Sequence, residues 1–180
     1  MATPALPKPP YSNLVEVMDE DVPQRLYRGV NTERFAKDQG LSPHKPGAQF
    51  SSVAGCGEDH ARCGSGIICG DAATNTVVAH QWKRTGAFPG GTSGISTTPH
   101  FEQARNYALH DGSYSAGKVI EFDSMGLRNL GVHIFRVKHL VPAPAVAVPE
   151  DDEYILVADD FGAIPKSAVV QIHDVTLSAP

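Results

Sequence analysis

The sequence lacks several features that would assign it to a large class of proteins. It has no apolar run long enough to cross a membrane, and its N-terminus shows neither the basic region nor the apolar stretch of a secretory signal. Its 15 Lys and Arg are outnumbered by 20 Asp and Glu, and the net charge of −5 gives no electrostatic case for binding nucleic acid or an anionic membrane. Neither a GxGxxG fingerprint nor a P-loop occurs. We therefore expect a protein with no membrane span and no nucleic acid among its partners.

What the chain does have is the composition of an ordinary globular domain. Of its 180 residues, 41% are apolar and 19% are charged, which is enough for one domain with its own core. The 17 Gly and 14 Pro favour many turns and short elements. Proline is concentrated at the start, so residues 1–22 are predicted to be an extended tail or linker. The domain itself is then expected over residues 23–180.

The three cysteines lie in one glycine-rich segment, residues 53–70. Cys56, Cys63 and Cys69 cannot form a closed set of disulfides, because their number is odd. His60 lies between them, but the spacing contains no CxxC knuckle of the kind that holds zinc. Free or structural thiols, one disulfide and a zinc site all remain open. Of these we favour the thiols and expect no metal.

The hydrophobic pattern predicts short strands, most of them in the C-terminal half. Strand patterns cover residues 25–30, 94–97, 119–122, 132–137, 153–157 and 168–175. A strand, then helices, then mostly strands argues for an α+β fold with antiparallel sheets rather than a doubly wound parallel sheet.

Three helices are expected between these strands. The first has Asn31 as its N-cap and ends at Gly40. The second runs over residues 71–84 and buries Trp82. The third is predicted to be capped by Thr98, with the following proline at its first position.

A run of four acids, Glu150 to Glu153, leads directly into the apolar segment Tyr154–Val157. The plain interpretation is a solvated turn before a strand. If strand pairing begins within the acid run, however, Asp151 and Glu153 point the same way, because residues i and i+2 share one face of a strand. Two carboxylates at a strand end can divide a reaction between them. One can stabilise developing positive charge while the other orients a second reactant.

Arg28 lies at the inner end of the first strand and is followed at once by Gly29. It can be a surface arginine on an edge strand. It can also be a rigidly held guanidinium that binds a phosphate or carboxylate, with Gly29 letting a ligand approach the backbone.

Three segments resemble the Arg, Ser-Thr-Ser and Glu-x-Glu motifs of mono-ADP-ribosyltransferases, in the R-S-E group that includes cholera toxin and the heat-labile enterotoxins. They are Leu26-Tyr27-Arg28-Gly29, Gly94-Ile95-Ser96-Thr97-Thr98 and Asp151-Asp152-Glu153. The resemblance spans residues 26–175. It implies the fold of that family, in which two antiparallel β-sheets with flanking helices pack around an NAD-binding cleft.

The resemblance also implies a role for each matching residue. Arg28 would hold NAD through its phosphate and ribose region, with Gly29 beside it. Ser96 would bind the nicotinamide ribose and position Glu153, with Thr97 in a secondary role. Glu153 would stabilise the oxocarbenium-like centre as nicotinamide leaves. This division is chemically reasonable, because a fixed carboxylate is worth more once positive charge develops on the ribose, and a pyrophosphate calls for a cation.

One departure from the family concerns the first acid. Arginine-modifying members have Glu at the position of Asp151, and several others have Gln. Asp is one methylene shorter, so its reach to an acceptor guanidinium is reduced. The acceptor can therefore be arginine or a hydroxyl residue such as Thr or Ser. The cysteine-containing segment 53–70 is a second departure, interpreted as an insertion that contacts the target protein.

The predicted function is that of a bacterial toxin or effector, secreted or delivered into a target cell, with NAD as co-substrate and virulence as its setting. We expect a monomer that modifies a protein of a host or competitor cell.

The alternatives are an NAD glycohydrolase on the same fold, a non-catalytic NAD- or protein-binding module, a zinc protein built on the cysteines, and a glycosidase that uses the paired acids. A non-catalytic cleft has no need of Arg28, Ser96 and Glu153 together, which argues against the binding module. Substitution of Asp151 separates transferase from glycohydrolase, because it is expected to abolish transfer and spare hydrolysis.

Overall fold

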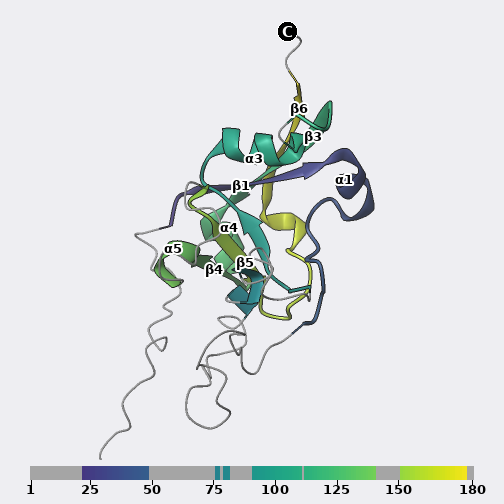
Figure 1. Ribbon diagram of the computed structural model, residues 1–180. Helices are drawn as coiled ribbons and strands as arrows, with labels where there is room; N and C mark the ends of the chain where they lie inside the picture. The colour runs from purple at the N-terminus through teal and green to yellow at the C-terminus, as the bar shows by residue number, and fades with distance from the viewer. Residues whose placement is uncertain are drawn as a thin grey trace, which may run out of the picture.

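The computed structural model describes residues 22–48, 76–77, 79–81, 91–110, 112–140 and 151–177, and these form two antiparallel three-stranded sheets (Figure 1). The first sheet has the order β1 (Arg25–Asn31), β3 (Ala116–Asp123) and β6 (Val169–Thr176). The second has the order β2 (Ile95–Thr97), β5 (Tyr154–Ala158) and β4 (Val132–Arg136). The predicted α+β class with antiparallel pairing is therefore confirmed.

Short helices connect and cover these strands. They are α1 (Thr32–Asp38), α3 (Phe101–Leu109), α4 (Ser124–Asn129), α5 (Val137–Leu140) and a 3₁₀ turn at Lys166–Ala168. The helix α3 packs on β1 and β3 (Figure 1). Among the helices of the described ranges, none is long and apolar enough to cross a membrane.

The caps of α1 follow the prediction. The side chain of Asn31 accepts a hydrogen bond from the backbone N–H of Arg34 at 2.7 Å. The helix ends with Gln39 in the left-handed region at φ 55°, and Gly40 follows at φ 71°. A residue with a short polar side chain before the helix and a glycine after it were sufficient to place both ends.

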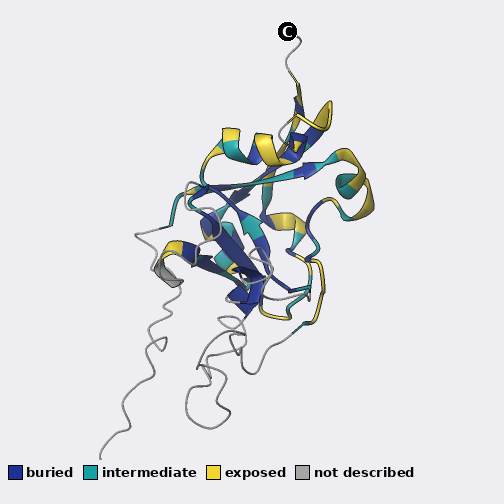
Figure 2. Cartoon of the chain, in the orientation of Figure 1, coloured by how far each residue is buried: buried dark blue, intermediate teal, exposed yellow. Residues whose placement is uncertain are grey.

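The core is centred on β5, which is buried along its whole length (Figure 2). This is the middle strand of its sheet, so both of its faces are covered, and its sequence is accordingly a continuous apolar run rather than an alternation. The largest cluster joins residues of both sheets and of the connecting helices, among them Leu26, Ile120, Phe122, Leu127, Ile134, Tyr154 and Leu156. Val22, the last residue of the predicted tail, also packs against this cluster.

The two sheets meet where β1 passes the end of β2. Tyr27 and Thr98 form a bridge in which the N–H of each donates to the carbonyl of the other, at 2.8 and 2.9 Å. The prediction that Thr98 caps the following helix is therefore wrong. Its backbone is held in this extended pairing, and α3 begins only at Phe101, with His100 as the N-cap. The Thr98 hydroxyl instead donates to the carbonyl of Asp151 at 2.7 Å.

Several strand ends and two helices differ from the predictions. β3 begins at Ala116, three residues before its predicted start, and every other strand end that differs does so by one residue, such as the start of β5 at Tyr154. The helices α4 and α5 were not predicted from the sequence. Of the predicted helix over residues 71–84, the described residues 76–77 and 79–81 are helical, and the rest, with Trp82, lies outside the described ranges. The same holds for residues 1–21 and for the cysteine segment 53–70.

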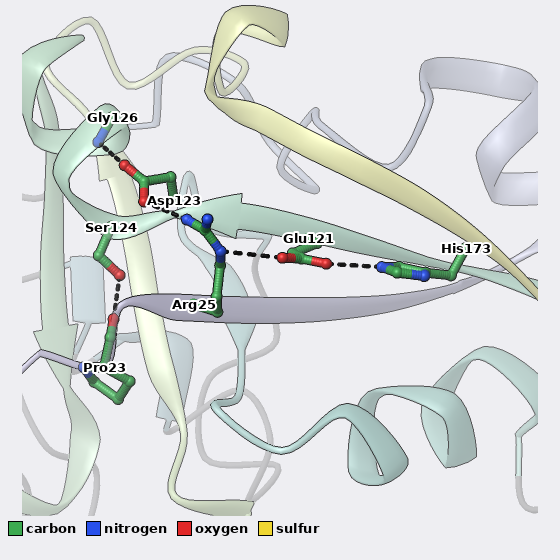
Figure 3. Close-up of polar contacts among 7 residues, drawn as sticks. All are labelled: Pro23, Arg25, Glu121, Asp123, Ser124, Gly126 and His173. Atoms are coloured by element: carbon green, nitrogen blue, oxygen red, sulfur yellow. Dashed lines mark hydrogen bonds and ion pairs between the residues drawn. The ribbon is translucent and has the colours of Figure 1, made fainter.

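A row of charged side chains crosses the first sheet (Figure 3). Arg25 of β1 contacts Glu121 of β3 through Nε at 3.1 Å and also pairs with Asp123. The other oxygen of Glu121 lies 2.8 Å from Nε2 of His173 on β6. Partly exposed pairs of this kind each contribute at most about 1 kcal/mol, so apolar burial provides most of the sheet's stability. Asp123 also accepts from the backbone N–H of Gly126 at 2.8 Å, which caps α4.

Two glycines allow α3 to lie directly on the first sheet. A Cβ added to Gly29 would stand 1.8 Å from the carbonyl oxygen of Ala104, and one added to Gly117 would stand 2.7 Å from that of Ala108. Both obstacles belong to the helix backbone, which cannot move aside alone. The position of α3 therefore depends on these two residues having no side chain.

Gly29→Ala is expected to destabilise the protein by at least about 2 kcal/mol, because the added methyl overpacks the contact between β1 and α3. The control is Gly47→Ala, where a Cβ meets nothing within 4 Å and only the left-handed backbone at φ 73° opposes the change. That strain costs about 1 kcal/mol. Urea unfolding of both variants measures the difference, and an equal loss in the two would show that α3 does not rest on Gly29 as described.

Candidate active site

A cavity of about 390 Å³ lies where β1, β2 and α3 approach the acid segment before β5. This volume lies in the range of small-molecule sites. The lining residues come from parts of the chain far apart in sequence: Tyr27, Arg28, Gly29, Pro43, His44, His80, Gly94, Ser96, Thr97, Thr98, Ala104, Tyr107, Asp151 and Glu153. This one cavity is lined by all the residues to which the family resemblance gives a role: Arg28, Gly29, Ser96, Thr97, Asp151 and Glu153.

Arg28 lies on the edge strand β1, but at the junction of the two sheets, where the residue is half-buried and its side chain is held by two backbone carbonyls. Its Nε donates to the carbonyl of Gly40 at 2.8 Å, and its Nη1 donates to the carbonyl of Ser96 at 2.9 Å. Burial, together with the nearby charge of Arg34, lowers the pKa of Arg28 to about 10, although the charges of Asp38 and Glu153 act in the opposite direction. The guanidinium is thus rigidly held and remains charged at neutral pH.

Ser96 is part of a chain of hydrogen bonds that the sequence analysis missed. Its Oγ lies 2.8 Å from Nε2 of His80, and Nδ1 of the same ring lies 2.8 Å from Oγ1 of Thr92. A neutral imidazole has one donor and one acceptor nitrogen, so the ring donates to one of these hydroxyls and accepts from the other, and both contacts hold its orientation. His80 lies in the predicted helix at 71–84, but one histidine on a helix carries no sequence pattern that would indicate this contact.

Glu153 is buried next to the start of β5. Gln81, which is also fully buried, donates from Nε2 to Oε2 of Glu153 at 2.6 Å. The backbone carbonyl of Glu153 accepts from the N–H of Val137 at 2.9 Å. The acid is therefore held through both backbone and side chain. Gln81 was likewise missed, because a neutral polar residue gives no signal in sequence until its partner is known.

Asp151 lies beside Glu153 in the cavity, as predicted, but the reason differs from strand alternation. Pairing begins only at Tyr154, and Asp152 has a left-handed backbone at φ 45°. This turn, rather than a pleat, sends Asp152 away from the cavity. Its carboxylate accepts from Nε and Nη2 of Arg136 at 3.0 and 2.7 Å, and pairs with Nζ of Lys138 at 3.0 Å.

Two of the predicted cofactor-binding residues have structural contacts of their own. On the side of Gly29 where a Cβ would lie, the space is filled by the backbone of α3, and Gly29 also lines the cavity. Thr97 donates from Oγ1 to the carbonyl of Tyr154 at 2.9 Å, which ties β2 to β5.

The cavity offers groups of both charges. A guanidinium and two carboxylates line one space, so the cavity presents a cation to an anionic ligand group and anions to a cationic one. Within the described ranges, no cluster of three or more His, Cys, Asp or Glu is arranged to hold a metal ion. The cysteines and His60 lie outside those ranges.

A scan against protein-family models gives no match, and a search of curated protein sequences finds none similar to this chain. The assignment of function therefore depends on the arrangement of the cavity residues.

Asp152 provides a pH-dependent test of the acid segment. Burial raises the pKa of its carboxyl, but the hydrogen bonds from Arg136 and Lys138 outweigh this and hold the pKa below its usual value. The resulting stabilisation is fully present above the unfolded-state pKa and is lost as the pH falls through the folded-state pKa. Asp152→Asn keeps a residue that tolerates the left-handed backbone. It is expected to lower the free energy of unfolding at pH 7 by up to about 1 kcal/mol, because solvent screens the pair.

The measurement is urea unfolding of both proteins at pH 7 and near pH 3. The deficit of the variant should shrink at the acid pH, where the wild-type carboxylate becomes protonated. The same deficit at both pH values would mean that shape, and not charge, accounts for the effect.

Proposed function

We propose that this protein is a mono-ADP-ribosyltransferase that moves ADP-ribose from NAD to an acceptor and releases nicotinamide. The observation that carries the proposal is the convergence of Arg28, Ser96 and Glu153 on one cavity, from three segments that also resemble the family motifs in order. We further propose the fold of that family for the two packed sheets. A bacterial effector that acts on a protein of another cell is the setting proposed for this activity.

The chemistry of NAD cleavage matches the charges of the cavity. Loss of nicotinamide leaves positive charge on the ribose, and Glu153 presents a carboxylate whose position is fixed by Gln81 and by Val137. Because that carboxylate is already oriented, it can stabilise the developing charge without reorganisation. Arg28 would face the opposite charge, that of the pyrophosphate, while it keeps its backbone contacts.

The Thr92–His80–Ser96 chain gives the serine a defined direction. With the imidazole held between two hydroxyls, Ser96 has one orientation relative to the ribose site, and a hydroxyl so held can donate to or accept from a ribose OH. We assign His80 and Thr92 as positioning residues that act through Ser96.

The decisive variant is Glu153→Gln, which keeps the size of the side chain and its contact with Gln81 but removes the charge. We expect a loss of at least about 100-fold in nicotinamide release, the scale on which removal of one preorganised electrostatic group acts. The matched control is Glu102→Gln on α3, whose side chain is 76% exposed and lies outside the cavity.

The measurement incubates each protein with labelled NAD and a cell lysate, and follows both nicotinamide release and label on protein. A labelled band that is lost with Glu153→Gln identifies a transferase, and mass spectrometry of that band names the acceptor. Nicotinamide release without a labelled band would favour an NAD glycohydrolase. If the wild type neither releases nicotinamide nor labels a band, the proposal is wrong.

A further inference from the structure

The carboxylate of Asp151 is held by two side chains of α3. Its Oδ1 accepts from Nε2 of Gln103 at 2.5 Å, and its Oδ2 accepts from the hydroxyl of Tyr107. Its backbone carbonyl accepts from the hydroxyl of Thr98. The whole residue is only 2% exposed although it lines the cavity. Asp151 is therefore fixed against the helix and does not extend toward an incoming protein.

This arrangement is poorly suited to an arginine acceptor. A guanidinium pairs with a carboxylate through two parallel N–H donors, which need both oxygens. On Asp151 each oxygen already accepts from a neutral donor and the residue is 2% exposed, so a guanidinium would have to share both oxygens with Gln103 and Tyr107 in a crowded site. The guanidinium of the acceptor would also lose its hydration, and it would enter a cavity that already contains the cation of Arg28.

The same contacts suit an acceptor that must lose a proton. Tyr107 is 46% exposed and lines the cavity, while its hydroxyl donates to the buried Asp151. A phenol oxygen both donates and accepts, so it can receive a proton on the cavity side as it passes its own to the carboxylate. Tyr107 thus connects the part of the cavity near solvent to a base that solvent does not reach.

We infer that Tyr107 and Asp151 form a proton relay for a neutral hydroxyl acceptor, with Gln103 as a positioning residue that holds the carboxylate. The inference rests on the proposed function and specifies its substrate class. The acceptor oxygen forms a bond to the anomeric carbon of the ribose. At the same time the bond from that carbon to nicotinamide breaks, and the electron pair of the breaking bond leaves with nicotinamide. The acceptor proton passes to the oxygen of Tyr107 and the phenol proton passes to Asp151. The carboxyl later returns a proton to Tyr107, which passes one on to solvent. Water and a Ser or Thr side chain share this chemistry.

The test supplies three acceptors to the full chain with NAD: water alone, methanol as the hydroxyl probe, and agmatine as the guanidinium probe. The products to be separated are ADP-ribose, methyl ADP-ribose and the agmatine adduct. The variants are Tyr107→Phe and Asp151→Asn. The matched control is Tyr114→Phe, because Tyr114 is also exposed, at 42%, but does not line the cavity.

We expect the wild type to form ADP-ribose and methyl ADP-ribose in clear excess over the agmatine adduct. Both variants should lower water and methanol products together by about 100-fold, the typical contribution of a positioned general base. For Asp151 this replaces the expectation from the sequence that its substitution spares hydrolysis. The KM for NAD should change little. The limb of the kcat–pH profile that reports a basic group should be absent in both variants. Tyr114→Phe should keep the wild-type rates.

A guanidinium site would give a different pattern. The agmatine adduct would dominate, and Asp151→Asn would lose that product while hydrolysis persisted, which would overturn the relay and leave the transferase proposal standing. Unchanged rates in Tyr107→Phe would also overturn the relay.

If the wild type releases no nicotinamide with any acceptor, the proposed function fails and the relay fails with it. Melting temperatures of the variants show whether a lost rate comes from unfolding. Tyr107→Phe, which removes a single hydroxyl, then provides the test.

Discussion

The cavity depends on the junction where the two sheets exchange backbone hydrogen bonds. Tyr27 and Thr98 pair across it, and Arg28, next in the chain to Tyr27, donates to the carbonyl of Ser96. Since Ser96 pairs in turn with Ile155 on β5, the acid segment just before β5 is placed by the same contacts. Three segments far apart in sequence are thus brought together mainly by main-chain bonds. Side chains at the surface can then vary without moving the cavity residues.

The junction also explains how the cavity keeps its charges. A buried guanidinium is costly, and the lowered pKa of Arg28 reflects that cost, which the field of Glu153 partly offsets. Glu153 and Asp151 are hydrogen-bonded by the neutral side chains of Gln81, Gln103 and Tyr107. Neutral donors orient a carboxylate but leave its net charge in place. That negative charge therefore remains available to a cationic centre. A direct salt bridge to these carboxylates would have neutralised it.

Much of the fold could be predicted, because its signals act within a few residues. Asn31 caps the helix that follows it, and the continuous apolar run of β5 corresponds to a strand covered on both faces. The predictions were wrong where a distant partner competed with a local preference. Thr98 has the side chain of a helix cap, but Tyr27 holds its backbone extended, so α3 begins later. The turn at Asp152 likewise replaced the expected strand alternation.

The sequence by itself determined the α+β class, most of the strands, and Arg28, Asp151 and Glu153 as candidate residues, because charged groups at strand ends carry recognisable local patterns. Ser96 became a candidate only through the family resemblance. Only the tertiary structure decided what holds these residues in place. Gln81 reaches Glu153 across 72 positions of the chain. Such a contact between one neutral amide and one acid has no period or motif, and it exists only once the two segments have been packed together.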